Sequence, residues 1–278
     1  MQVHLLQMNS QPASAQNLAL IQQQLERLPQ GPNPSLVVLP EACLGFGGDR
    51  PWSEGAEIAG QGPLQSALSA LARQHHCYLV AGTLPLLAAD GRAYASTLVW
   101  NHRGEPVGRY DKIHLFDAEV KDGSQYRESR HTHPGRQPVV IPTPWGRLGL
   151  AVCYDVRFPR LFEALSAAGA ELIALPSAFT HRTGQAHWEV LVRARAIESQ
   201  CYLLAANQWG QHQDGRQTWG QSMVVDPWGQ ILDQRPEGTG WVSAELSRQY
   251  ITQVRAEIPA LQHRRPLGPA NAIKTEDA

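Results

Sequence analysis

The sequence has few cysteines, little excess charge and no long hydrophobic segment. Its 4 cysteines among 278 residues have no Cys-x-x-Cys spacing, which argues against a zinc-finger pattern and favours a reducing, cytoplasmic setting. Lysine and arginine number 24 and aspartate and glutamate 25, so no basic surface for nucleic acid is expected. No apolar run approaches the roughly 20 residues that span a bilayer, and we expect neither a membrane segment nor a signal peptide.

Histidine is more abundant, with 11 residues, and this raises the question of a metal site. The pairs His75 and His76, and His131 and His133, have the closest spacing. No cluster of carboxylates and cysteines accompanies either pair to complete a set of metal ligands. We therefore predict no metal and no other cofactor.

Strand-like runs alternate with helical patterns along the whole chain, which is typical of an α/β fold. No low-complexity linker divides the chain. Residues 102–138 form the longest irregular stretch, as functional loops often do. Helices are expected at Ala13–Leu28, Pro63–Gln74, Pro159–Ala168, Gln185–Gln200 and, more weakly, Ser247–Ile258.

The two halves of the chain resemble each other. LVVLPE at 36–41 is similar to LIALPS at 172–177, and CYLVAG at 77–82 is similar to CYLLAA at 201–206. This spacing far exceeds that of a solenoid repeat, so two similar halves of one domain are indicated, with two sheets between helical layers. We expect this domain to span 1–265, followed by a Pro-rich and charged tail at 266–278.

Cys153 follows the apolar run Leu148–Val152 and precedes YDVRFP, a sharp turn leading into a helix. A thiol at such a turn is displayed at the end of a strand, where a helix N-terminus favours the reactive thiolate. The alternative is a buried core cysteine, which is common because free cysteine is among the most buried residue types.

Two further segments favour chemistry at Cys153. Glu41 follows the buried strand pattern LVVLP, and Lys112 follows a strand-like stretch in GRYDKIHLFD. Each alone would be read as an ordinary solvated charge. Together with Cys153 they supply a nucleophile, a carboxylate that can move a proton and a cation for a developing oxyanion, as amide hydrolysis requires.

These three segments, LPEACLG, GRYDKIHLFD and GLAVCYDVRFPRLF, resemble the Glu-Lys-Cys motifs of the nitrilase, or carbon-nitrogen hydrolase, superfamily, in the same order. The similarity runs from Val3 to the segment ending at Gly229. It implies a four-layer αββα sandwich, with Glu41, Lys112 and Cys153 as the catalytic triad.

The resemblance also implies roles for residues near the triad. Glu128 corresponds to a second glutamate that holds the lysine and faces the substrate, and the Tyr154 N–H is expected to complete the oxyanion hole with Lys112. Arg157 is a candidate for binding a substrate carboxylate, although an ion pair to Asp155 or Glu163 is an equal alternative.

Three more residues are candidates for substrate contact. Phe179 and Thr180 lie just past a predicted strand and are expected to form pocket walls. Arg127 is the next candidate for the carboxylate partner if Arg157 only supports the turn.

The segment HWEVLVRARAIESQCY is most similar to the branch of deaminated glutathione amidases. Hydrolysis of that α-keto acid amide to 2-oxoglutarate and cysteinylglycine, through a cysteine thioester, is therefore implied. Rivals are an ω-amidase acting on 2-oxoglutaramate, an N-carbamoyl amino acid hydrolase and, from another class, a binding scaffold with an idle site. A homodimer or homotetramer is expected, with the helix around Trp188 and Leu191 as one contact.

Overall fold

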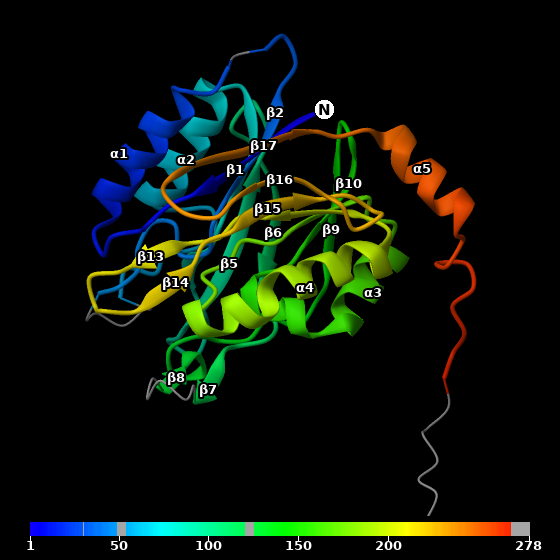
Figure 1. The fold of residues 1–278 in the computed structure, drawn as a ribbon. Coiled ribbons are helices and arrows are strands. Elements are labelled where there is room, and N and C mark those ends of the chain that lie inside the picture. The colour runs from blue at the N-terminus through cyan, green and yellow to red at the C-terminus, as the bar shows by residue number, and fades with distance from the viewer. Residues whose placement is uncertain (30, 49–53, 120–124, 268–278) are drawn as a thin grey trace, which may run out of the picture.

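The computed structural model describes residues 1–29, 31–48, 54–119 and 125–267. Two β-sheets lie face to face in the middle of the molecule, and helices cover their outer faces (Figure 1). The predicted αββα sandwich is therefore confirmed.

The first sheet carries the strand that leads to Glu41. Its order is β17-β1-β2-β3-β5-β4, with β6 paired to β5, and β1, β2 and β3 run parallel to one another. Its strands are β1 (Gln2–Gln7), β2 (Ser35–Leu39), β3 (Cys77–Ala81), β4 (Leu84–Leu87), β5 (Ala93–Trp100), β6 (Pro106–Asp111) and β17 (Gly240–Glu245).

The second sheet carries the strand that leads to Cys153. Its order is β16-β15-β12-β11-β10-β9, and β10, β11 and β12 are parallel. The repeated sequence pairs thus occupy corresponding places, as β2 and β3 in one sheet and β11 and β12 in the other. The strands are β9 (Val139–Thr143), β10 (Gly146–Leu150), β11 (Leu172–Ala174), β12 (Tyr202–Ala205), β15 (Ser222–Val225) and β16 (Ile231–Arg235).

Strand β2 shows why the sandwich forms. Leu36 and Val38 belong to a hydrophobic cluster shared with the second sheet, whereas Val37 and Leu39 belong to a cluster shared with the covering helices. Because successive side chains of a strand point to opposite faces, a continuous apolar run is buried on both sides. Each fully buried Val or Leu side chain stabilises the fold by about 1.5–3 kcal/mol.

Helices α1 (Ser14–Leu25) and α2 (Pro63–Gln74) cover the first sheet, and α3 (Pro159–Ala167) and α4 (His181–Ser199) cover the second (Figure 1). Proline occupies the first turn of α2 and α3, where no backbone N–H is needed. Helix α5 (Arg248–Glu257) follows β17 and begins at the side-chain cap of Ser247. All five expected helices are present; α4 begins four residues earlier than predicted, at His181.

The strand-like stretch before Lys112 is β6, and five other short strands, including β4, were not predicted. The others are two small hairpins that lie apart from the main sheets: β7 (Asp117–Glu119) with β8 (Gln125–Arg127), and β13 (Trp209–Gln211) with β14 (Gln217–Trp219). Their sequences show no clear alternation of apolar and polar residues, because backbone pairing with a neighbouring strand, and not burial of one face, holds them in place. The expected irregular stretch at 102–138 therefore contains β6, β7 and β8.

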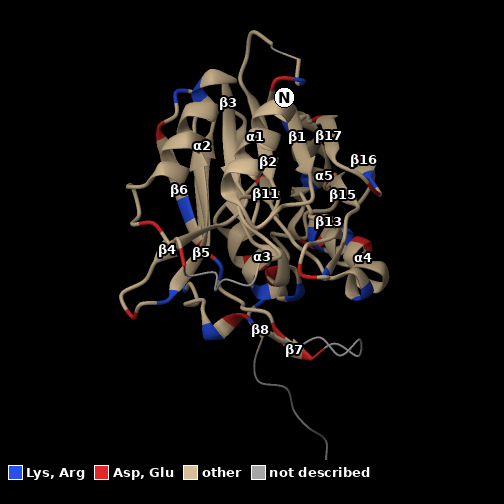
Figure 2. Ribbon diagram, turned by 90° about the vertical axis from the view of Figure 1, so that its left-hand side faces the viewer, with Lys and Arg blue, Asp and Glu red and all other residues tan. Residues whose placement is uncertain are grey.

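Charged residues of both signs are interspersed along the loops and helices, and the central strands carry few (Figure 2). Among the described residues, no helix is long and apolar enough to cross a membrane. In the same part of the chain, no group of three or more His, Cys, Asp or Glu side chains is placed to hold a metal ion.

The expected role of Trp188 in a subunit contact is wrong. Its side chain is fully buried, packs beside Phe179 and donates a hydrogen bond of 2.8 Å to the Gln221 carbonyl. The outer face of α4 instead exposes Val190 and Ile197. The homo-oligomer stays a prediction, as does the boundary at 265, and residues 268–278 of the expected tail lie outside the described residues.

Candidate active site

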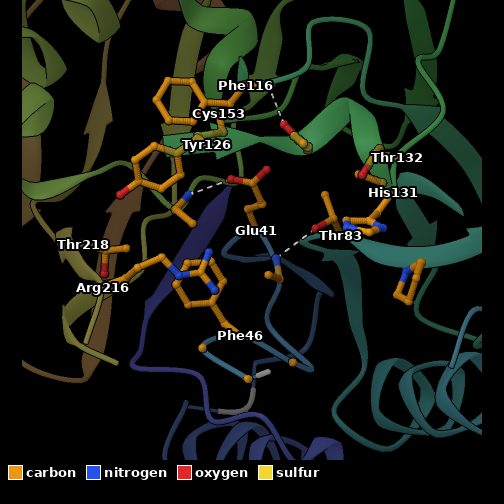
Figure 3. Close-up of a pocket in the computed structure, with 18 of the residues that line it drawn as sticks. Glu41, Phe46, Thr83, Phe116, Tyr126, His131, Thr132, Cys153, Arg216 and Thr218 are labelled. Carbon is orange, nitrogen blue, oxygen red and sulfur yellow. Dashed lines mark hydrogen bonds between the residues drawn. The ribbon is translucent and has the colours of Figure 1, made fainter. Parts of the chain in front are cut away.

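A pocket of about 1250 Å³ opens where the strand ends of the two sheets meet (Figure 3). It draws its lining from both halves of the chain. All nine residues singled out from the sequence line it: Glu41, Lys112, Arg127, Glu128, Cys153, Tyr154, Arg157, Phe179 and Thr180.

Glu41 is held firmly at the end of β2. The next residue, Ala42, has a positive φ of 54° and donates its N–H to the Thr83 hydroxyl at 2.9 Å. The Gln208 side chain donates to the Glu41 carbonyl at 2.9 Å. Gly82 passes so close that a Cβ there would lie 1.9 Å from the Pro40 carbonyl oxygen, so only glycine fits. The backbone around Glu41 is therefore fixed by both halves of the molecule.

The Glu41 carboxylate has a separate partner for each oxygen. Oε1 accepts a hydrogen bond of 2.8 Å from the Lys112 ammonium, and Oε2 accepts one of 2.9 Å from the Ala178 N–H. Ala178 follows β11, whose sequence resembles that of β2. The equivalent strand ends of the two halves thus meet at this carboxylate.

Lys112 follows β6 and is almost fully buried, with its ammonium group between two carboxylates. Nζ lies 2.8 Å from Glu41 Oε1 and 2.9 Å from Glu128 Oε2. Burial alone would lower the pKa of this ammonium, but the charges of Glu128 and Glu41 outweigh burial and hold the pKa well above its ordinary value. Lys112 is therefore a fixed cation.

Glu128 completes this charge cluster. Besides Lys112, it accepts a hydrogen bond of 2.6 Å from the Phe116 N–H. Burial, with the nearby Glu41 charge, raises the pKa of Glu128, and the Lys112 ammonium opposes this rise. The predicted contact between Glu128 and the lysine is present.

Cys153 lies at a strained turn after β10 and begins a short 3-10 helix, Cys153–Arg157. Its φ is +46°, which is uncommon for any residue other than glycine, and such strain often occurs at functional sites. The Cys153 N–H donates to the Pro176 carbonyl at 2.9 Å, which ties the turn to the end of β11.

The expectation that a helix N-terminus makes Cys153 a ready thiolate is wrong. Burial and the adjacent Glu41 carboxylate raise the pKa of the Cys153 thiol well above its ordinary value, although Lys112 opposes them. Cys153 itself begins the short 3-10 helix, and helix α3 begins only at Pro159, six residues later. The thiol rests protonated, with a proton acceptor beside it.

Asp155 joins the Cys153 turn to the segment that carries Lys112. Its fully buried carboxylate accepts hydrogen bonds from the Val152 N–H at 2.9 Å and the Tyr110 hydroxyl at 2.7 Å. It also contacts His114, whose N–H donates at 3.1 Å. Tyr110 and His114 flank Lys112 by two residues on either side. This link could not be predicted from the sequence, because it depends on the contact between the two sheets.

Tyr154 and Arg157 lie on the same turn. Among the described residues, the Tyr154 N–H has no hydrogen-bond acceptor of its own, so it remains available to a ligand. The Arg157 guanidinium lies 5.1 Å from the Phe179 ring centroid and 3.3 Å from His187 Nδ1. It makes neither of the ion pairs considered from the sequence, to Asp155 or Glu163, within the described part of the chain. Burial lowers its pKa.

The three remaining candidates differ in exposure. Phe179 and Thr180 are buried walls at the end of the segment that follows β11. Arg127 is exposed and forms an ion pair of 3.0 Å with Glu119, so it is less available to a ligand than Arg157.

Arg216 and Thr218 of the β13–β14 hairpin, which were not predicted from the sequence, form one wall of the pocket together with Phe46 (Figure 3). The Asp214-Gly215 pair at the hairpin tip is a turn signal that could have revealed the hairpin. Its approach to the pocket could not have been found, because the contacts join segments about 170 to 200 residues apart: Phe46 with Arg216, and Met8 with Trp209.

Comparisons with known proteins agree with this geometry. The family described as Carbon-nitrogen hydrolase matches residues 2–256. A deaminated glutathione amidase from Yersinia enterocolitica is 43% identical over 95% of this chain and 92% of its own length. A deaminated glutathione amidase from Synechocystis sp. (strain PCC 6803 / GT-S) is 38% identical over 93% of this chain and 96% of its own length.

Solved structures show the same fold. Saccharomyces cerevisiae Nit3, a member of branch 10 of the nitrilase superfamily, has a TM-score of 0.84 and 31% identity, covering 93% of this chain and 94% of that one. A mutant amidase from Nesterenkonia sp. AN1, solved after Michael addition of acrylamide at its active-site cysteine, has a TM-score of 0.75 and 29% identity, covering 93% and 98%. The chain belongs to the carbon-nitrogen hydrolase family of the nitrilase superfamily.

Proposed function

We propose that this hydrolase cleaves the amide bond of deaminated glutathione, giving 2-oxoglutarate and cysteinylglycine, with Glu41, Lys112 and Cys153 as its catalytic residues. The observation that carries the chemistry is the Lys112 ammonium held 2.8 Å from Glu41 beside the Cys153 thiol. The names of the Yersinia and Synechocystis relatives support the substrate.

The first half of the reaction forms a thioester. Glu41 accepts the Cys153 proton as the sulfur attacks the amide carbon, so that no free thiolate has to accumulate in the buried site. The oxygen of the tetrahedral intermediate receives hydrogen bonds from Lys112 and the Tyr154 N–H. Each such donor typically contributes about 3–4 kcal/mol of transition-state stabilisation. Glu41 then returns the proton to the amide nitrogen, and the C–N bond breaks.

The second half releases the acid. A water molecule enters where the amine has left, and Glu41 removes one of its protons as the oxygen attacks the thioester carbon. The C–S bond breaks, and Cys153 recovers its proton from Glu41. Glu128 keeps Lys112 charged and in place through both halves.

A substrate panel tests the proposal. We would compare deaminated glutathione, 2-oxoglutaramate, an N-carbamoyl amino acid and a nitrile at equal enzyme concentration. The highest kcat/KM is expected for deaminated glutathione. A preference for 2-oxoglutaramate or the carbamoyl compound would assign one of the rival activities, and turnover of none of the four would favour an idle binding scaffold.

A further inference from the structure

A second arginine reaches the pocket from the β13–β14 hairpin. The Arg216 guanidinium lies over the Phe46 ring, 4.4 Å from its centroid (Figure 3). Its Nε donates to Asp214 Oδ2 at 2.5 Å. Within the described residues its two Nη groups have no partner, so the outer edge of the guanidinium can still bind an anion.

Arg216 is held in place before any ligand arrives. Phe46 also packs edge to face with the His212 ring, at a centroid distance of 4.4 Å. His212 is buried and contacts the Thr218 hydroxyl at 2.8 Å, across the same hairpin. Because these contacts already hold the Arg216 guanidinium in place, its side chain loses less conformational entropy on binding than an unrestrained arginine would.

The charges of the pocket show why a second anion-binding group matters. Lys112 is already shared between Glu41 and Glu128, so it adds no net positive charge for a ligand. Arg127 is paired with Glu119 at the exposed rim. Arg216 is also paired, with Asp214, but only through Nε, whereas Arg127 uses an Nη group for Glu119. Among the described lining residues, Arg157 and Arg216 therefore remain as the arginines whose Nη groups can face substrate carboxylates.

The two arginines reach the pocket from different segments, Arg157 from the turn after Cys153 and Arg216 from the β13–β14 hairpin. Arg157 stands on the Cys153 turn, over Phe179, where the acyl group stays attached to sulfur. Arg216 lies over the ring of Phe46. Phe46 belongs to the same segment as Glu41, five residues further along the chain. Because Glu41 must protonate the departing nitrogen, the leaving group has to lie on the Glu41 side.

We propose that Arg216, supported by Phe46, binds the terminal carboxylate of the leaving group, so that the pocket selects amides with an anion at both ends. This inference rests on the proposed amidase function. A dipeptide leaving group such as cysteinylglycine extends about 7 Å and ends in a carboxylate. A pocket of about 1250 Å³ has room for it beyond the acyl group.

The test uses three amides with the same 2-oxoglutaryl acyl group. Their leaving groups are cysteinylglycine, the uncharged cysteinylglycinamide, and ammonia. We would measure kcat/KM for the wild type, Arg216→Gln and Phe46→Leu. Arg103→Gln is the matched control, since Arg103 also pairs with an acidic residue two positions away but lies on the surface outside the pocket.

Arg216→Gln is expected to reduce the preference for cysteinylglycine over cysteinylglycinamide by about 10-fold or more, the typical effect of losing a charged hydrogen bond. Phe46→Leu should reduce the same preference by a smaller factor, and Arg103→Gln should leave it unchanged. An unchanged preference in Arg216→Gln, with wild-type enzyme still cleaving the amides, would overturn the inference and spare the proposed function. Failure of the wild type to cleave any of the three would overturn both.

Discussion

Lys112 and Glu41 form a buried ion pair of 2.8 Å between residues 71 positions apart in the sequence. The pair brings a proton carrier and a fixed cation to the same thiol. Neither group can be replaced without changing the charge felt by the other, because both are withdrawn from water. They therefore act as one unit.

We expect Glu41→Gln and Lys112→Ala each to lower kcat by several orders of magnitude, and the double variant to be little worse than either, since residues that act together are non-additive. Lys112→Ala also leaves the Glu41 and Glu128 carboxylates without their cation, so its stability must be measured alongside its activity. If the fold-reduction of kcat in the double variant equals the product of the two single fold-reductions, Glu41 and Lys112 act independently and the prediction is contradicted.

Cys153 is expected to be the only cysteine that carries an acyl intermediate. Its side chain lines the pocket beside Glu41, whereas Cys43, Cys77 and Cys201 are buried and do not line the pocket. Rapid acid quench during turnover, followed by peptide mass analysis, should place the adduct on Cys153. Normal turnover by Cys153→Ala, or an adduct on Cys43, would contradict the assignment.

Arg157→Lys should lower kcat/KM for α-keto acid amides by about 10-fold or more, because a lysine ammonium cannot make the paired hydrogen bonds that a planar guanidinium makes to a carboxylate. An amide that lacks the α-keto acid carboxylate should be affected much less. The guanidinium also packs over Phe179 and Tyr154, so the alternative is that it only supports the turn. Equal losses on both substrates would favour that alternative and direct attention to Arg127.

Stability should fall in alkaline solution. Burial raises the pKa of Cys77 from 9.0 to about 12 in the folded protein. As pH rises above 9.0, the unfolded chain releases this proton while the folded chain retains it, so stability present at lower pH is lost.

At pH 10 the Cys77 contribution to this loss is about 1 kcal/mol. Urea unfolding of wild type and Cys77→Ala at pH 8 and pH 10 would measure it, because the variant should lose about 1 kcal/mol less between the two pH values. Identical losses in the two proteins would show that Cys77 does not titrate differently on unfolding.

A homodimer or larger assembly is expected from the family resemblance. The outer face of α4 leaves Val190 and Ile197 at 69% and 50% exposed, which fits a subunit contact. Ile197→Glu should shift sedimentation toward the monomer, whereas Leu87→Glu, at the similarly exposed Leu87 on β4, should not. A wild-type species of only 30.6 kDa at micromolar concentration would contradict the expectation.

The sequence by itself determined the order of the main elements and the identity of the central site residues. Continuous apolar runs such as 36–39 can be satisfied only by strands buried on both faces, and proline at 63 and 159 marks helix starts, so local physics was enough. Glu41 and Cys153 could be recognised because each follows an apolar run, and Lys112 because its segment GRYDKIHLFD resembles the family motif.

Only the tertiary structure decided how these groups act on one another. The protonated state of Cys153 depends on its burial and on Glu41, which lies 112 residues earlier in the chain. The anchoring of Asp155 by Tyr110, the inward position of Trp188 and the placement of Arg216 over Phe46 likewise depend on contacts between distant segments. Such contacts leave no periodic pattern in the sequence, because their energy arises where the two sheets and the hairpin meet.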